Sequence, residues 1–340
     1  MYTIELVVPC YNEESCIELF YNRIVEIFHQ DRLNNFDFVI TYIDDGSKDN
    51  TMSEIKRVEK VHCERLASCE TDKGRIQYIS LSRNFGKESA LYAGLQKSSG
   101  DYVCVLDADL QHPPELITEM LDAIENEGYD CASARRVARH GEPFFRKFFS
   151  KLFCNIINKI TVMDLVPGAT DYRLMKRKVV EAIVSMPESE RFTKGIYSWI
   201  GFKNKWIEYK DVERVAGETT WNFRGLVRYA YSGFLAFATT PLRGVIYLGS
   251  LVVVIAIITA IMTFISALGT SGSERNGFAT LLIVMLLLGG AIITILGMIG
   301  EYMARIYMEV KNRPIYFARE TNIDIVPEIK EVNNNLQDDN

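Results

Sequence analysis

Two long stretches without a charged residue constrain the fold of this chain more than any other feature of its sequence. They cover residues 244–273 and 276–300. A membrane-spanning helix needs about 20 predominantly apolar residues, so each stretch is long enough to cross a bilayer. We expect two transmembrane helices, at about 245–268 and 278–299, within a membrane segment of residues 244–303. The alternative is a pair of buried core helices in a soluble protein.

The short loop between the two stretches predicts that the helices form a hairpin. That loop carries one arginine and one glutamate, whereas cationic side chains gather outside the hairpin. The flanking cations are Arg224, Arg228, Arg243, Arg305, Lys311 and Arg313. By the positive-inside rule, both ends of the hairpin face the cytoplasm. The sequence therefore predicts a multi-pass protein of the cell membrane with its N-terminal domain in the cytoplasm.

Further segments flank this membrane part. Residues 222–243 combine arginines with aromatic side chains, which suits the headgroup zone, so we expect a juxtamembrane amphipathic segment there. Residues 144–160 repeat apolar side chains at helical spacing among basic ones. That helix either lies in the membrane interface or packs on the sheet. Residues 304–340 are expected to form a cytoplasmic tail with a disordered, acidic and amide-rich end.

Residues 1–221 alternate short apolar runs with segments of helical periodicity. Strands are expected at 4–8, 38–43, 76–81, 102–106 and 131–134, and helices at 15–28, from about 51, at 87–97 and at 114–127. This alternation predicts an α/β domain with a Rossmann-like, mostly parallel sheet. Such sheets bind ligands at the carboxyl ends of their strands.

Charge and cysteine content argue against two classes of function. The net charge is −6, so nothing indicates a nucleic-acid partner. The seven cysteines are odd in number and none forms a Cys-x-x-Cys pair. A disulfide framework and a thiolate metal site are therefore both unexpected.

The sharpest polar motif is Asp107-Ala108-Asp109, directly after a buried apolar run. Two carboxylates so close repel each other unless a cation or a proton lies between them. Gln111 adds a neutral oxygen, and Mg²⁺ or Mn²⁺ accepts such a set while keeping water and phosphate oxygens. We expect a divalent cation here that bridges the diphosphate of a bound nucleotide. The alternative is a solvated turn.

Four motifs follow one another along the chain: Pro9 to Glu13, Asp44 to Ser47, Arg83 to Lys87 and Asp107 to Pro113. Singly they are weak, since Asp-Gly-Ser is also an ordinary turn. In this order they resemble the family 2 inverting glycosyltransferases, which have the GT-A fold. With two C-terminal spans, the chain is similar to the polyprenyl-phosphate glycosyltransferases. These include dolichyl-phosphate mannose synthase and, more closely similar, the bactoprenol glucosyltransferases of the GtrB type.

The resemblance implies a metal-dependent enzyme. It would transfer a single sugar, from UDP-glucose or UDP-N-acetylglucosamine in preference, to polyprenyl (undecaprenyl) phosphate. The product would serve the modification of cell-envelope glycans. The family also implies Mg²⁺ or Mn²⁺ as cofactor, the bilayer as a partner, and a homo-oligomer, a tetramer as in relatives.

The resemblance also assigns roles to residues at matching positions. Asp171 would be the catalytic carboxylate near the acceptor, and Arg135, with a looser match at Arg146, would contact the acceptor phosphate. The metal would be held by Asp107, Asp109 and Gln111. The nucleotide pocket would be lined by Pro9, Tyr11, Asn12, Glu13, Asp44, Asp45, Asp107 and Ala108. One departure is Thr220, where many relatives carry a lysine; Arg224 is the candidate substitute.

Three alternatives stay open. A dolichyl-phosphate-mannose-synthase-like enzyme would use GDP-mannose. A processive polysaccharide synthase would usually carry a Gln-x-x-Arg-Trp motif and more spans, and neither is found. A non-catalytic membrane scaffold could bind nucleotide sugars, although the intact carboxylates at Asp107, Asp109 and Asp171 argue against it.

Overall fold

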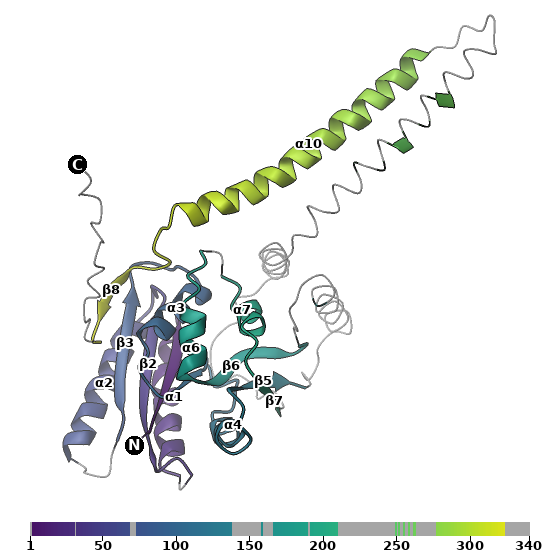
Figure 1. Cartoon of the computed structure of the whole chain (residues 1–340). Helices are drawn as coiled ribbons and strands as arrows, with labels where there is room; N and C mark the ends of the chain where they lie inside the picture. The colour runs from purple at the N-terminus through teal and green to yellow at the C-terminus, as the bar shows by residue number, and fades with distance from the viewer. Residues whose placement is uncertain are drawn as a thin grey trace, which may run out of the picture.

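A computed structural model describes most of the N-terminal domain and a long C-terminal helix (Figure 1). The described residues are 2–30, 32–68, 73–137, 166–189, 191–209 and 277–323, with single positions at 158, 249, 251, 254, 255, 258, 261 and 262. Three expected features lie outside these residues, apart from those single positions. They are the amphipathic segments 144–160 and 222–243 and the first span, 245–268.

Eight strands in the described residues form one sheet, in the order β7-β5-β6-β4-β1-β2-β3-β8. Their bounds are β1 Tyr2–Cys10, β2 Phe36–Asp44, β3 Arg75–Leu81, β4 Tyr102–Val105, β5 Cys131–Arg136, β6 Ala169–Lys176, β7 Asn204–Tyr209 and β8 Ala318–Thr321. Strand β1 pairs in parallel with β2 and β4, β2 with β3, and β5 with β7. Strands β6 and β8 are antiparallel to their neighbours. The expected mostly parallel sheet is therefore confirmed.

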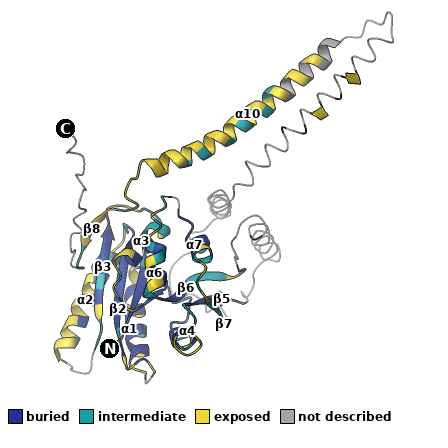
Figure 2. Cartoon of the chain, viewed as in Figure 1, coloured by how far each residue is buried: buried dark blue, intermediate teal, exposed yellow. Residues whose placement is uncertain are grey.

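Helices cover both faces of the sheet, which gives three layers (Figure 2). Their bounds are α1 Glu14–Phe28, α2 Thr51–Ser68, α3 Lys87–Lys97, α4 Leu116–Glu125, α6 Arg177–Val184 and α7 Thr193–Trp199. Successive side chains of a strand point to opposite faces, so β1 serves two cores. Leu6 and Val8 belong to the core under α1, α2 and α4, and Val7 belongs to the core under α3 and α6. Burial on both faces explains the continuous apolar runs of the central strands.

Helix α10, Gly277–Val310, extends away from these layers as one continuous helix of 34 residues (Figure 1). At about 1.5 Å per residue it is long enough to cross a bilayer. Its stretch Leu288–Val310 is the one candidate span in the described residues by length and composition, and none of it is buried. The expected second span, 278–299, lies inside α10. Since the first span falls outside the description, one apolar helix is shown and a hairpin is not.

The chain returns from α10 to the edge of the eight-stranded sheet, which the sequence did not predict. Strand β8 pairs antiparallel with β3 at the edge of the sheet. Asn322 follows it, and its side-chain oxygen accepts a 2.7 Å hydrogen bond from the backbone N–H of Tyr78. Lys56 forms an ion pair of 2.6 Å with Glu320. The beginning of the expected tail is thus part of the folded domain, while residues 324–340 lie outside the description.

Candidate active site

The carboxylates of Asp44 and Asp45, at the end of β2, accept hydrogen bonds from neighbouring segments, including the loop before α3. Asp44 accepts hydrogen bonds from the Ser47 N–H at 2.9 Å and from the Ser80 hydroxyl at 3.0 Å. Asp45 accepts from the backbone N–H groups of Phe85 at 2.7 Å and Gly86 at 2.9 Å. Burial raises the pKa of Asp45, and these two backbone bonds partly offset that rise. Both carboxylates therefore hold loops in place at the carboxyl edge of the sheet.

Gly46 shows why glycine follows this pair. Its φ of +68° is in the left-handed region, which glycine adopts readily. A Cβ built there would lie 2.5 Å from the carbonyl carbon of Arg83. Only a residue without a side chain lets the two loops approach so closely.

The loop after β1 joins the same edge. The N–H of Asn12 donates to the Ser47 hydroxyl oxygen at 2.9 Å, and the Asn12 side-chain oxygen accepts from the Lys48 N–H at 2.9 Å. The N–H of Glu13 donates to the Thr51 hydroxyl oxygen at 2.9 Å. Two of the expected nucleotide-binding segments are thus tied together. At the end of β1 and directly after it, Pro9 and Tyr11 are half-buried, and Asn12 is exposed.

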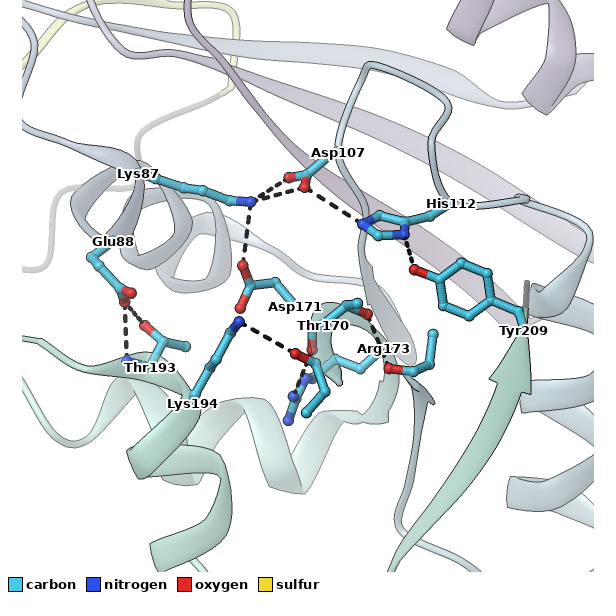
Figure 3. A network of polar contacts seen from close by, with 12 residues as sticks. Lys87, Glu88, Asp107, His112, Thr170, Asp171, Arg173, Thr193, Lys194 and Tyr209 are labelled. Atoms are coloured by element: carbon cyan, nitrogen blue, oxygen red, sulfur yellow. Dashed lines mark hydrogen bonds and ion pairs between the residues drawn. The ribbon is translucent and has the colours of Figure 1, made fainter. Parts of the chain in front are cut away.

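Lys87 links two further expected site residues (Figure 3). Its ammonium lies 2.7 Å from Oδ1 and 2.9 Å from Oδ2 of Asp107, at the end of β4. It also lies 3.3 Å from Oδ2 of Asp171 on β6. Partial desolvation at the site disfavours the charged lysine, but the two carboxylates outweigh this effect and raise the pKa of Lys87. One cation therefore joins the expected metal-side and acceptor-side carboxylates.

Asp171 is surrounded by cations. Burial alone would raise its pKa, but the charges of Lys194 and Lys87 outweigh burial and hold the pKa of Asp171 well below its usual range. The charge of Arg173 adds to this effect, and the Arg173 guanidinium stacks at 3.3 Å on the ring of Tyr197. Asp171 is thus a carboxylate that stays ionised at neutral pH.

The expected metal ligands follow β4 in a tight loop. Leu110 has φ +53°, and Oδ1 of Asp109 accepts a 3.1 Å hydrogen bond from the Gln111 N–H. His112 follows this loop, and its ring lies between two partners. Its Nε2 is 3.8 Å from Asp107, and its Nδ1 is 2.5 Å from the Tyr209 hydroxyl. Burial lowers the pKa of His112, which keeps the ring neutral. The charges of Asp107 and Asp109 oppose this lowering.

The oxygen ligands of this loop fit a hard divalent cation that takes the rest of its ligands from water and phosphate. In the part of the chain that the structure describes, no three His, Cys, Asp or Glu side chains form a metal cage. The loop offers the Asp107 and Asp109 carboxylates and the Gln111 amide. Mg²⁺ and comparable ions commonly take one or two carboxylates and complete their shell with water and phosphate. The Lys87 ammonium at Asp107 shows that this edge already accommodates a positive charge.

Arg135 lies near this site on β5. Its Cα pairs with Ala169, two residues before Asp171, and its Nε donates to the Pro167 carbonyl at 3.2 Å. Glu208 on β7 lies 3.5 Å from its guanidinium. Arg146, the other residue expected at the acceptor phosphate, lies outside the described residues, as do Thr220 and its candidate substitute Arg224. The structure therefore brings Arg135 to the same part of the sheet as Asp171 but does not test the rest.

Three residues of this site, Lys87, His112 and Lys194, had no expected role. Lys87 lies in the motif Arg83 to Lys87, and His112 lies in the motif Asp107 to Pro113, so the sequence pattern already pointed to both positions. Lys194 had no such signal, because the packing of α7 against α3 brings its side chain to the Ala169 carbonyl, on the strand that carries Asp171. Thr193 donates to the Glu88 carboxylate from its N–H, at 3.0 Å, and from its hydroxyl. This contact between α3 and α7 sets Lys87 and Lys194 on either side of Asp171 (Figure 3).

Comparisons with known proteins find a matching family model and relatives that match most of the chain. The family model "Glycosyl transferase family 2" matches residues 5–184. The glycosyltransferase CsbB of Bacillus subtilis is 39% identical over 94% of this chain and 92% of its own length. The SfII prophage-derived bactoprenol glucosyl transferase of Shigella flexneri is 37% identical over 94% of this chain and 98% of its own. Among solved structures, the mannosyltransferase PcManGT of Pyrobaculum calidifontis covers 86% of each chain at 16% identity, with a TM-score of 0.44.

Proposed function

The chain belongs to glycosyl transferase family 2, and from this membership we propose that it transfers a single sugar from a nucleotide sugar to polyprenyl phosphate. Relatives that match over nearly their whole length are named bactoprenol glucosyl transferases, and bactoprenol is a polyprenol. The observation that carries the proposal is the site itself. Asp107 and Asp171 are held by one ammonium at the carboxyl edge of the sheet, where a donor and an acceptor can meet.

The chemistry is a displacement at the anomeric carbon of the sugar. A phosphate oxygen of the lipid forms a new bond to that carbon, the bond to the nucleoside diphosphate breaks, and the configuration inverts. A phosphate monoester has a second pKa of about 6, so the nucleophile is mostly a dianion at neutral pH. It needs no strong general base. A carboxylate with a lowered pKa is a poor proton acceptor, so we assign Asp171 the role of orienting the attack.

We propose that Asp107, Asp109 and Gln111 hold Mg²⁺ or Mn²⁺ against the donor diphosphate. When bound, the metal ion would act as a Lewis acid that neutralises the charge of the leaving group. The support is the donor set described above, two carboxylates and an amide next to a site that already holds a cation. Removal of divalent ions should therefore stop transfer.

We propose that the nucleotide lies over the loops after β1 and β2. Pro9, Tyr11, Asn12 and Glu13 would line this pocket, together with Ala108. The carboxylates of Asp44 and Asp45 are already engaged by protein groups, so they would act by shaping the loops around the nucleotide. On the acceptor side we propose Arg135 and Arg146, because arginine side chains suit phosphate geometry.

The membrane part of the proposal extends beyond the single apolar helix. We propose that residues 245–268 and 278–299 span the cell membrane as a hairpin and that residues 222–243 lie at its cytoplasmic face. The lipid chain then stays in the bilayer while its phosphate reaches the domain, and confinement of both partners favours their encounter. UDP-glucose or UDP-N-acetylglucosamine is the favoured donor, and a homo-tetramer is the proposed assembly. GDP-mannose is the alternative donor.

A donor panel tests this function. The full chain, purified in detergent, is incubated with undecaprenyl phosphate and each nucleotide sugar, with and without a chelator. The expected product is the lipid phosphate bearing one sugar, formed only with divalent ions present. Addition of many sugars would indicate a processive synthase. Binding of nucleotide sugar without any turnover would indicate a scaffold.

A further inference from the structure

Lys87 and Lys194, the two lysines near Asp171, differ in how many of their hydrogen-bond donors are occupied by protein groups. The Lys87 ammonium has three oxygens within 3.3 Å, two on Asp107 and one on Asp171. A lysine has three donors, so Lys87 is saturated by protein groups. Within the described residues, the Lys194 ammonium makes one hydrogen bond, of 3.3 Å, to the backbone carbonyl of Ala169. Lys194 therefore keeps donors available for a ligand.

Lys194 is held in place independently of Asp171. It lies in α7, and the preceding residue, Thr193, is bonded to Glu88 on α3. Farther along the helix, the ring of Tyr197 stacks against the buried guanidinium of Arg173 at 3.3 Å. Two contacts on the helix thus fix α7 against α3 and β6. The side chain of Lys194 consequently points toward the Asp171 carboxylate from the side opposite to Lys87 (Figure 3).

An acceptor phosphate needs a cation at this position. If Asp171 orients the attack, the phosphate of the lipid must come close to a carboxylate that is already ionised. Two anions side by side repel each other unless a positive charge lies between them. Lys87 is already committed to both carboxylates. Lys194 has available donors, and its side chain points toward Asp171 (Figure 3).

We propose that Lys194 binds the phosphate of the lipid acceptor and holds it beside Asp171. This inference rests on the proposed function and deepens it, because it names the group that receives the lipid phosphate next to the reacting carbon. Lysine is a compact cation whose donors rotate, and it binds phosphate as a point charge. Arg135 would then contact the phosphate from the β5 side.

The test separates the binding of the two substrates. Lys194→Gln is prepared in the full-length protein, and the apparent KM of undecaprenyl phosphate and of the nucleotide sugar are measured with kcat. We expect the KM of the lipid to rise about tenfold to a hundredfold, the usual effect of losing a charge-assisted hydrogen bond. The KM of the nucleotide sugar should change less than about twofold. Lys194→Arg should recover most of the lipid affinity.

Lys178→Gln is the matched control, because Lys178 pairs at 2.6 Å with Asp130 and is 56% exposed. Equal rises in both KM values for Lys194→Gln would mean that Lys194 only maintains the site, and would overturn the inference. An unchanged KM of the lipid would overturn it as well. In either case the unaltered protein still makes the lipid product, so the proposed function stands. If the unaltered protein glycosylates no polyprenyl phosphate, the proposed function fails and the inference fails with it.

Discussion

The ammonium of Lys87 lies 2.7 Å from one oxygen of Asp107 and 2.9 Å from the other, so a single lysine engages the whole carboxylate. Lys87 is the first residue of α3, and Asp107 follows β4. The contact therefore joins a helix start to a strand end at the edge where the motifs converge. Lys87 is 40% exposed, which leaves this side of the site open to solvent and to ligands.

Replacing Lys87 should impair catalysis more than folding. Lys87→Met leaves the Asp107 and Asp171 carboxylates without their shared cation, and their repulsion should misplace both. We expect kcat/KM to fall roughly a hundredfold, comparable to the loss of one preorganised polar contact in other active sites. Lys97→Met, on the exposed last turn of the same helix, is the control. Normal kcat/KM in Lys87→Met would show that the carboxylates need no such bridge.

The pH dependence of the rate should follow the lipid phosphate and not Asp171. The pKa of Asp171 is lower in the folded protein than the ordinary value of 3.8, so it is protonated, and loses its ion pair with Lys87, only in strong acid. The acceptor titrates at about 6. We expect kcat/KM to rise with pH through this region. Asp171→Asn should lower kcat at least about tenfold and keep that rise. Disappearance of the rise would identify Asp171 as the titrating group.

Gly46 and Gly128 form a matched pair for testing the loop contact. Both have positive φ, +68° and +76°, so alanine costs about 1–2 kcal/mol of backbone strain at either position. A Cβ at Gly46 also meets the backbone of Arg83 at 2.5 Å, whereas nothing lies within 4 Å at Gly128. Gly46→Ala should therefore lower the free energy of unfolding by about 1–3 kcal/mol more. Denaturant unfolding of both variants measures this difference, and equal losses would contradict the close approach.

Asn322 should protect the edge of β3 from hydrogen exchange. Its side-chain oxygen accepts from the Tyr78 N–H at 2.7 Å, and its nitrogen donates to Glu59 at 2.7 Å. In Asn322→Ala the Tyr78 amide loses its acceptor, so its exchange rate should rise about tenfold or more. Asn126→Ala removes a comparable hydrogen bond to Asp122 on the surface of α4 and serves as control. Unchanged protection of Tyr78 would show that Asn322 does not hold this edge.

The central elements were predictable because their sequence signal is strong. The helix expected at 87–97 is α3, Lys87–Lys97, and the strand expected at 102–106 is β4, Tyr102–Val105. Strands that are buried on both faces give continuous apolar runs between turn residues. Strand β6 lacks such a run, because Asp171 and Arg173 occupy it. Strand β8, Ala318–Thr321, is polar and exposed, and hydrogen bonds rather than burial hold it, so no hydrophobic pattern marked it.

The candidate site was predictable to a similar degree. Motif residues at strand ends converge because parallel strands end at one edge, so a position of Asp107 near the other motifs could be expected on this ground. The position of Lys194 depends on the contact between Glu88 and Thr193, which are 105 residues apart. No local pattern in the sequence reports such a contact. The role of Asp45 was also hidden, since its bonds to Phe85 and Gly86 exist only in the folded chain.

The order of the strands along the chain has a consequence for biosynthesis. A polypeptide emerges from the ribosome with its N-terminus first, and its domains begin to fold during synthesis. Seven strands of the sheet precede α10, and β8 follows it. The outer edge of β3 thus stays open until the apolar helix has left the ribosome, and an open edge is a template for pairing with other chains. The catalytic sheet can therefore be completed only after α10 has been synthesised. A chain arrested within that helix would expose an aggregation-prone strand.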